Sequence, residues 1–247
     1  MEPAEYGLMA AAEERMWWYR ALHGHLARWS GVALAGSPLR ILDAGCGTGG
    51  VLKRLAAVAL RPIDAYGLDF DPQACQFTAE KTTASVVRGS INCLPYADAR
   101  FDLIISADVL SNRWVEEAEA LSEFRRCLAR DGRLILNLPA YDWMMGEHDR
   151  HVYNARRYTR GRIAERLAAA GMTPTRSTYW NTIPFPLMAL HRKVLSRRQE
   201  ASDVQLFPAP VEAAFNAAMG LEALWLRAGL SLPFGGSVLV EAKRKSD

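Results

Sequence analysis

The 247-residue sequence has few cysteines and almost no excess of charge of either sign. Its four cysteines are scattered, with no C-x-x-C pair and no metal-ligand spacing, so we predict neither a disulfide framework nor a metal site. The formal net charge is +3, from 30 basic and 27 acidic residues. A charge this small creates no general basic field, and we therefore expect no nucleic-acid partner.

Long hydrophobic runs, repeats and low-complexity segments are also missing. No stretch of 18 apolar residues occurs, and residues 1–5 are acidic with no apolar leader after them. These absences argue against a transmembrane segment and a secretory signal, so we expect a cytoplasmic protein. With 50% hydrophobic and 23% charged residues, the composition is that of an ordinary globular chain. The length suits a single α/β domain, residues 1–247, with additions.

The most informative stretch is a glycine-rich segment at residues 41–50. A short apolar run ends in Asp43, glycines follow at Gly45, Gly47 and Gly49, and residues 51–57 have helical apolar spacing. This pattern predicts a strand, a tight turn and a helix. Glycines permit positive φ and close approach of a ligand, and the helix N-terminus offers unpaired N–H groups. We therefore predict that a small, partly charged ligand binds at this turn.

The residue pattern of this turn distinguishes between two protein families. Gly45, Gly47 and Gly50 fit the G-x-G-x-x-G dinucleotide fingerprint, which is weak evidence alone. With Asp43 two residues before the first glycine, however, the segment resembles the cofactor loop of class I S-adenosylmethionine-dependent methyltransferases. The resemblance implies that S-adenosyl-L-methionine binds here and leaves as S-adenosyl-L-homocysteine. It implies cofactor contacts from Asp43, Gly45, Cys46, Gly47 and Gly49.

A second acidic residue ends the next predicted strand, residues 63–69. Asp69 follows Gly49 by twenty residues, a spacing that places a carboxylate near two ribose hydroxyls. Phe70 is positioned to lie against the adenine. The methyltransferase family often has an aspartate where Ser90 stands, so here Ser90, the backbone of Ile91 or Asn92 is expected to contact the adenine.

The continuous apolar run at residues 101–106 predicts a parallel strand that is buried on both faces. It ends in Ala107 and Asp108, and its carboxyl end should face the site. Asp108 is a candidate for contact with the methionyl end of the cofactor or with the substrate. Where the family often has Glu-His shortly afterwards, residues 111–114 read Ser-Asn-Arg-Trp, so no base is assigned there.

Residues 141–158 are dense in aromatic residues, methionine and arginine, and they follow the fifth predicted strand. His148 and His151 are three residues apart and would share a helical face. Three interpretations stay open for them: a general base, a metal-ligand pair, or a structural role with Arg156 and Arg157. We name the two histidines as catalytic candidates and assign no metal. The substrate-contact candidates in this stretch are Trp143, Tyr153, Arg157 and Tyr158.

The pattern of this stretch also resembles a bacterial subgroup of methyltransferases that serve glycan, lipid or natural-product assembly. The resemblance covers residues 37–181 and 236–247, which we predict to form the cofactor-binding core. It implies a doubly wound, seven-stranded, mostly parallel sheet of the Rossmann-like methyltransferase type, with the last strand antiparallel.

Two helical additions flank this core. Residues 1–36 are predicted to form an N-terminal lid, in which Trp17 packs in the core. We expect Trp18 to contact the cofactor, and Tyr19 and Arg20 to contact the substrate. Residues 182–235 are predicted to form a helical insert before the last strand. The insert could cap the substrate pocket, form a homodimer contact, or adhere to a lipid surface.

The sequence thus predicts a methyltransferase that moves a methyl group to an oxygen or nitrogen of a small or medium organic acceptor, a natural-product or glycan/lipid intermediate. Two alternatives remain. A nicotinamide-dependent oxidoreductase would share the glycines and Asp69, although it would not need Asp43. A protein that binds the cofactor without transferring the methyl group is also compatible, because no residue is chemically obligatory for methyl transfer.

Overall fold

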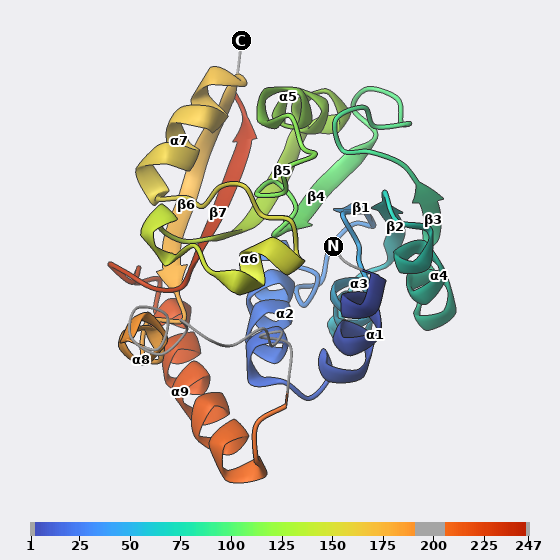
Figure 1. Ribbon diagram of the computed structural model, residues 1–247. Helices are drawn as coiled ribbons and strands as arrows, with labels where there is room; N and C mark the ends of the chain where they lie inside the picture. The colour runs from blue at the N-terminus through green and yellow to red at the C-terminus, as the bar shows by residue number, and fades with distance from the viewer. Residues whose placement is uncertain (1–2, 191–205, 246–247) are drawn as a thin grey trace.

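The computed structural model describes residues 3–190 and 206–245 and is built on one seven-stranded sheet (Figure 1). The strand order is β3-β2-β1-β4-β5-β7-β6, with β7 antiparallel to both of its neighbours and the other pairs parallel. The predicted fold is therefore confirmed. The strands are β1 (Leu39–Ala44), β2 (Ile63–Asp69), β3 (Ser85–Arg88), β4 (Phe101–Ala107), β5 (Leu128–Pro139), β6 (Met172–Trp180) and β7 (Ser237–Arg244).

Two apolar layers, one on each face of the sheet, form the core. Successive strand residues point to opposite faces, so Ile41 and Leu103 pack in one layer while Leu42 and Ile104 pack in the other. All four side chains are fully buried. One layer is completed by α5 (Glu117–Cys127) and α7 (Arg160–Ala169), the other by α2 (Trp17–Ser30) and α3 (Gly50–Val58). The continuous apolar run of β4 reflects this burial on both sides.

The junction of α5 and β5 differs from the sequence prediction. The apolar spacing at residues 116–129 and the Arg-Asp-Gly at residues 130–132 predict a helix that continues to Ala129, but the helix ends at Cys127 and the strand begins at Leu128. Leu128 pairs with Phe101 of β4 and is fully buried. A Cβ on Gly132 would lie 3.0 Å from the Phe101 carbonyl oxygen, so the glycine allows the two backbones to approach. Pairing with β4 therefore overrides the helical pattern of these residues.

The apolar spacing at residues 8–29 predicts one amphipathic helical stretch, but the N-terminal segment forms two helices. Helix α1 (Pro3–Ala12) is followed by a short turn and by α2. Trp17 opens α2 and is only 5% exposed, as its position on the apolar stripe predicted. Helix α4 (Pro72–Lys81) is capped by Asp71, whose carboxylate accepts a hydrogen bond from the Gln73 N–H.

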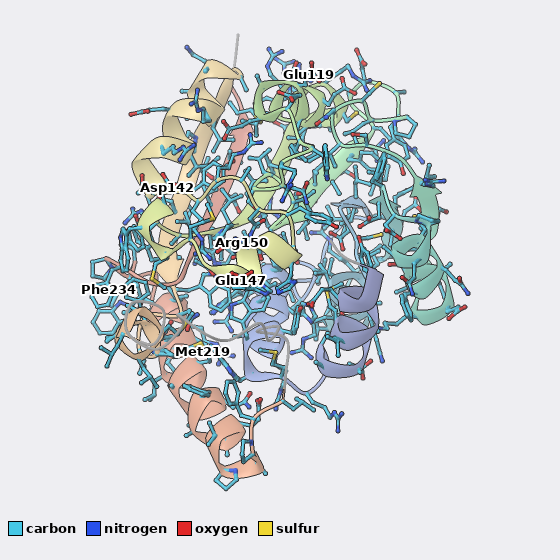
Figure 2. All side chains as sticks on the ribbon, in the orientation of Figure 1. Glu119, Asp142, Glu147, Arg150, Met219 and Phe234 are labelled. Carbon is cyan, nitrogen blue, oxygen red and sulfur yellow. The ribbon has the colours of Figure 1, made fainter. Side chains whose placement is uncertain are left out.

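The segment between β6 and β7 contains α8 (Phe185–Leu190) and α9 (Ala209–Arg227). Helix α9 packs beside α2, with the rings of Trp17 and Phe215 4.8 Å apart. Met219 on α9 is buried in this contact (Figure 2). The buried Glu222 carboxylate ties the helix to the end of β6, because it accepts hydrogen bonds from the N–H groups of Asn181 and Ile183. The predicted helix at residues 187–198 lies largely outside the described residues.

Two short helices, η1 (Asp142–Met144) and α6 (Glu147–His151), occupy the loop after β5. Glu147 and Arg150 of α6 lie near each other at the surface (Figure 2) and form an exposed ion pair. Within residues 3–190 and 206–245, no helix has the length and apolar character that crossing a membrane requires.

Candidate cofactor and acceptor site

A single large cavity opens at the carboxyl ends of β1, β2 and β4, where an open α/β sheet places its ligands. Its volume is about 1190 Å³, above the roughly 300–1,000 Å³ range of ordinary small-molecule pockets. The glycine loop and Asp69 line one part of it. Residues of α1, α2, α6, α8 and α9 line the rest. The cavity is therefore large enough to hold two ligands together.

The glycine loop is held open by backbone conformations that suit glycine. Gly45, Gly47 and Gly49 have φ angles of 93°, 52° and 83°. The N–H of Gly45 donates to the Leu68 carbonyl oxygen at 2.7 Å, which ties the loop to β2. A Cβ on Gly45 would lie 2.1 Å from a methyl group of Val109. Gly45, Cys46 and Gly47 line the cavity, whereas Gly49 turns the chain into α3 outside it.

Asp69 stands at the end of β2 beside this loop. One carboxylate oxygen accepts a hydrogen bond from the Gly47 N–H at 3.0 Å, and the other accepts from the Asp71 N–H at 3.0 Å. Burial raises the pKa of Asp69, and these two hydrogen bonds act in the opposite direction. Each carboxylate oxygen keeps a further acceptor site. The side chain can thus hold the loop and still accept from a vicinal diol in the cavity.

Asp43 is buried beneath the loop and does not line the cavity. Neither of its carboxylate oxygens has a hydrogen-bond partner among the residues that the structure describes. Burial, followed by the charge of Asp69, raises its pKa well above the usual value. A buried carboxyl group without a partner needs a donor from water or a ligand. Together with the open glycine loop, this fits a cofactor that carries positive charge.

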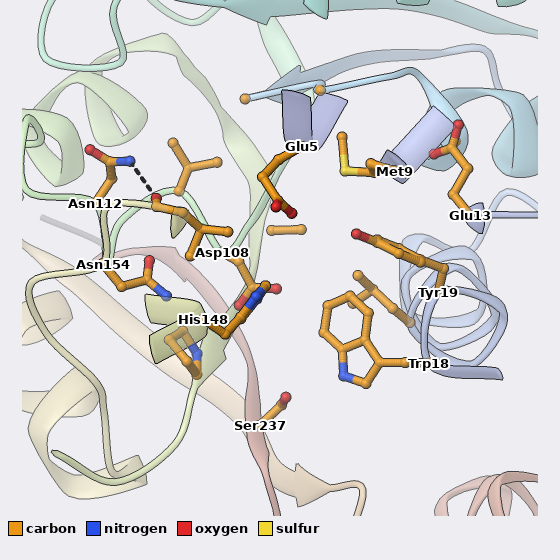
Figure 3. A pocket seen from close by; sticks show the side chains of 18 of the residues that line it. Glu5, Met9, Glu13, Trp18, Tyr19, Asp108, Asn112, His148, Asn154 and Ser237 are labelled. Atoms are coloured by element: carbon orange, nitrogen blue, oxygen red, sulfur yellow. Dashed lines mark hydrogen bonds between the residues drawn. The ribbon is translucent and has the colours of Figure 1, made fainter. Parts of the chain in front are cut away.

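Asp108, at the end of β4, points into the same space as Tyr19, Glu5 and His148 (Figure 3). Its φ of 58° is unusual for a residue with a side chain and is typical of functional sites. One carboxylate oxygen accepts from the Asn137 amide at 3.0 Å, and Asn137 in turn accepts from the Trp180 indole N–H at 2.8 Å. Burial raises the pKa of Asp108 to about 7.

Residues of the two N-terminal helices, α1 and α2, line one side of the cavity. Trp18 and Tyr19 both line it and meet edge to face, with ring centroids 5.0 Å apart. Arg20, one position further along α2, is exposed and lies outside the cavity, so we withdraw it as a substrate contact. Sequence reasoning did not single out Glu5 and Met9 of α1, which also line the cavity.

The adenine candidates Phe70, Ser90 and Ile91 all line the cavity, and so does Ala107. Phe70 is 71% exposed at its rim, so its ring is available to a flat ligand.

The loop after β5 divides its predicted residues between the cavity and the protein interior. His148 and Tyr153 line the cavity, but His151 does not. Trp143 also lies outside the cavity and stacks on Tyr141 with centroids 5.8 Å apart. Tyr158 is fully buried, and its hydroxyl donates to the Leu110 carbonyl oxygen. The structure therefore gives no support for substrate contacts by Trp143, which is half-exposed outside the cavity, or by Tyr158, whose ring is buried.

Arg157 borders the cavity, but its guanidinium is used internally. It donates to both carboxylate oxygens of Asp149, at 2.9 and 3.1 Å, and to the Ala140 carbonyl oxygen at 3.0 Å. Both side chains of the ion pair are buried. Its geometry matches the structural alternative, in which the arginine orders the loop. In the described part of the chain, no three His, Cys, Asp or Glu side chains are grouped to hold a metal ion.

The central part of the chain is similar in sequence to known proteins. Residues 42–136 match the family model described as "Methyltransferase domain". The chain is 33% identical over 104 residues to a ubiquinone/menaquinone biosynthesis C-methyltransferase of Geotalea uraniireducens, a match that covers 39% of this chain and 44% of that protein. It is 34% identical over 122 residues to a malonyl-[acyl-carrier protein] O-methyltransferase of Erwinia pyrifoliae, covering 47% and 45%. It thus spans about half the length of these relatives.

Among solved structures, the fold is similar to that of a protein solved in complex with the Haloferax volcanii Trm112 methyltransferase activator. The TM-score is 0.65 at 17% sequence identity, over 99% of this chain and 96% of the other. At that identity the similarity shows the fold alone. It extends beyond residues 42–136, the part that matches the family model.

Proposed function

Because the chain belongs to the class I S-adenosylmethionine-dependent methyltransferases, we propose that it transfers the cofactor's methyl group to an oxygen or nitrogen of a small or medium organic acceptor. The single observation that supports this most strongly is the shared cavity, which joins the glycine loop to a separate apolar region. S-adenosylmethionine supplies an electrophilic methyl group on a sulfonium. The chain must then position both reactants in line and exclude water.

In this proposal the cofactor is held by residues at or just after the ends of four strands, β1 to β4, and by Trp18 of α2. Asp69 accepts the ribose hydroxyls, while Phe70, Ser90 and Ile91 contact the adenine. Gly45, Cys46 and Gly47 offer backbone to the methionine part, with Gly49 shaping the turn. Asp43 acts on the charged end through water, and Ala107, Asp108 and Trp18 border the methyl group.

The acceptor then lies between α2 and α6, next to Tyr19, Tyr153 and His148. His148 is the candidate general base, since it lines the cavity and an acceptor hydroxyl or amine must lose a proton. The insert caps the acceptor pocket through α8. The outer face of α9, with Leu221, Leu224 and Trp225 exposed, is where a homodimer contact would form, and sedimentation velocity tests it.

Calorimetric titration with S-adenosylmethionine, S-adenosylhomocysteine and NAD tests the proposal directly. Binding of the first two at micromolar concentration, without binding of NAD, is the expected result. Binding of NAD alone would replace the proposal with hydride transfer. Sequence similarity does not identify the acceptor atom, because the relatives include a C-methyltransferase and an O-methyltransferase. An acceptor screen by mass shift should therefore include phenols, amines and activated carbon nucleophiles.

Replacing Asp69 with alanine should weaken S-adenosylhomocysteine binding by about 100-fold. The variant loses charge-assisted hydrogen bonds to two hydroxyls, each worth roughly 1.5–3 kcal/mol. It also loses the bond that fixes the Gly47 N–H. Asp64, an exposed acid on the same strand, provides the matched control Asp64→Ala. Equal affinities for the two variants would refute the ribose assignment.

Replacing His148 with alanine should lower turnover by about 100-fold or more and leave cofactor affinity within about twofold, as expected for a lost general base. His151 lies in the same short helix but outside the cavity, so His151→Ala should retain most activity. Turnover is compared for both variants at saturating cofactor. Normal turnover in His148→Ala would leave this histidine with a structural role.

The second candidate, cofactor binding without methyl transfer, is favoured by the absence of any residue that the chemistry strictly requires. Its signature would be tight S-adenosylmethionine binding with every tested acceptor returned unmodified. Isotope-labelled methyl transfer into a cell extract from the source organism separates it from the enzyme.

A further inference from the structure

The part of the cavity far from the glycine loop has a distinct chemistry. Apolar side chains from four separate segments line it, and most of them come from the insert and from α2. The rings of Phe207 and Phe215 lie 5.7 Å apart, and Phe215 also meets Trp17. Leu187 and Met188 of α8 extend this surface to the outside. A binding region this apolar gains free energy by burying hydrocarbon.

Among the cavity's lining residues that the structure describes, carboxylates outnumber basic side chains. Five carboxylates line it, namely Glu5, Glu13, Asp69, Asp71 and Asp108. Among the described lining residues, Arg157 is the one lysine or arginine, and its guanidinium is paired with Asp149. His23 contributes no cation near neutral pH, because burial, followed by the charge of Arg54, lowers its pKa to about 4.

These two features act together on any molecule that enters beside the cofactor. An anionic group would lose its hydration and meet carboxylates instead of a cation, which disfavours binding. A neutral hydroxyl or amine can instead donate to Asp108, whose second carboxylate oxygen faces the cavity. A hydrocarbon chain attached to that group would lie along the apolar region.

We infer that the acceptor is an uncharged amphiphile, with a hydroxyl or amine head near Asp108 and His148 and an apolar tail against α8, α9 and α2. This inference rests on the proposed function and narrows it to one class of acceptor. The described lining of the cavity disfavours carboxylate and phosphate acceptors.

Ligands that share an octyl tail but differ in the charge of the head group test whether the cavity prefers an uncharged head. The protein is titrated with para-octylphenol, para-octylaniline and para-octylbenzoate, with and without saturating S-adenosylhomocysteine. We expect the phenol and aniline to bind at least about tenfold more tightly than the benzoate, and phenol without a chain to bind more weakly still. Equal affinity for phenol and benzoate heads would overturn the inference. Loss of S-adenosylhomocysteine binding alone would overturn the proposed function.

Substitution of two exposed leucines of the insert tests whether the apolar tail of the acceptor binds against α8. Leu187 lines the cavity and is 61% exposed, whereas Leu224 is 57% exposed on α9 and does not line it. Leu187→Glu should weaken para-octylphenol binding by about tenfold, and Leu224→Glu should not. Leu187→Lys should also reduce the discrimination against the benzoate. Because both sites are exposed, both variants should fold, and identical behaviour of the two would overturn the inference.

Discussion

Between about pH 5 and about pH 8, the ligand-free protein should lose stability relative to its Asp108→Asn variant. Burial raises the pKa of Asp108 from 3.8 to about 7. A carboxyl group with a raised pKa in the folded state stabilises the fold fully below its unfolded pKa, and this contribution is lost as pH rises through the folded pKa. The shift of roughly three units sets an upper limit of about 4 kcal/mol on the loss.

Urea unfolding at several pH values measures this difference. The control is Asp102→Asn on the same strand, whose pKa is lowered, mainly by its hydrogen bond from Arg40. That stabilisation is present above the unfolded pKa and is lost only in acid, so the control should show no trend between about pH 5 and about pH 8. Parallel curves for wild type and Asp108→Asn would show that Asp108 is not the buried titrating group.

The same carboxyl group links stability to ligand binding. A cationic sulfonium near Asp108 favours the ionised form, so cofactor affinity should rise with pH up to about pH 7 in the wild type. It should vary less in Asp108→Asn. The ligand-free protein is less stable with Asp108 ionised than with Asp108 protonated. Binding of a cation in the cavity should therefore stabilise the fold.

Residues whose role depends on nearby sequence were predicted well. The bounds of β2, Ile63–Asp69, follow from an apolar run and turn chemistry within a few residues. The glycine loop belongs to the same class, because its backbone conformation is required by its own sequence. These features are local, and the loop's place at the strand ends follows from the parallel topology.

Features that depend on distant partners were not predictable from the pattern. Leu128 extends β5 because it pairs with Phe101, 27 positions earlier in the chain. Tyr158 resembles a ligand contact in sequence, yet its hydroxyl reaches the Leu110 carbonyl oxygen in the core. Aromatic residues serve both roles, and only the packing decides between them.

Replacing Arg157 with alanine should lower the free energy of unfolding by about 3–5 kcal/mol, the range for breaking a buried ion pair. The variant would leave the buried Asp149 carboxylate without its two guanidinium hydrogen bonds. Burial acts to raise the pKa of Asp149, but the charge of Arg157 and its hydrogen bonds lower it below the usual value. The stabilisation is therefore present at neutral pH and is lost as pH falls through the folded pKa.

Arg150→Ala is the matched control. Arg150 lies on α6, the helix that carries Asp149, and forms an exposed ion pair with Glu147. This exposed pair should contribute less than about 1 kcal/mol to the free energy of unfolding. The double variant Arg157→Ala/Asp149→Ala should be more stable than Arg157→Ala, since it removes the unpaired buried charge. Asp149 and His148 are neighbours in α6, so loss of the ion pair should also lower turnover by releasing His148 from its position in the cavity. Equal losses of stability in Arg157→Ala and Arg150→Ala would contradict this account, because they would mean that burial adds nothing to the ion pair.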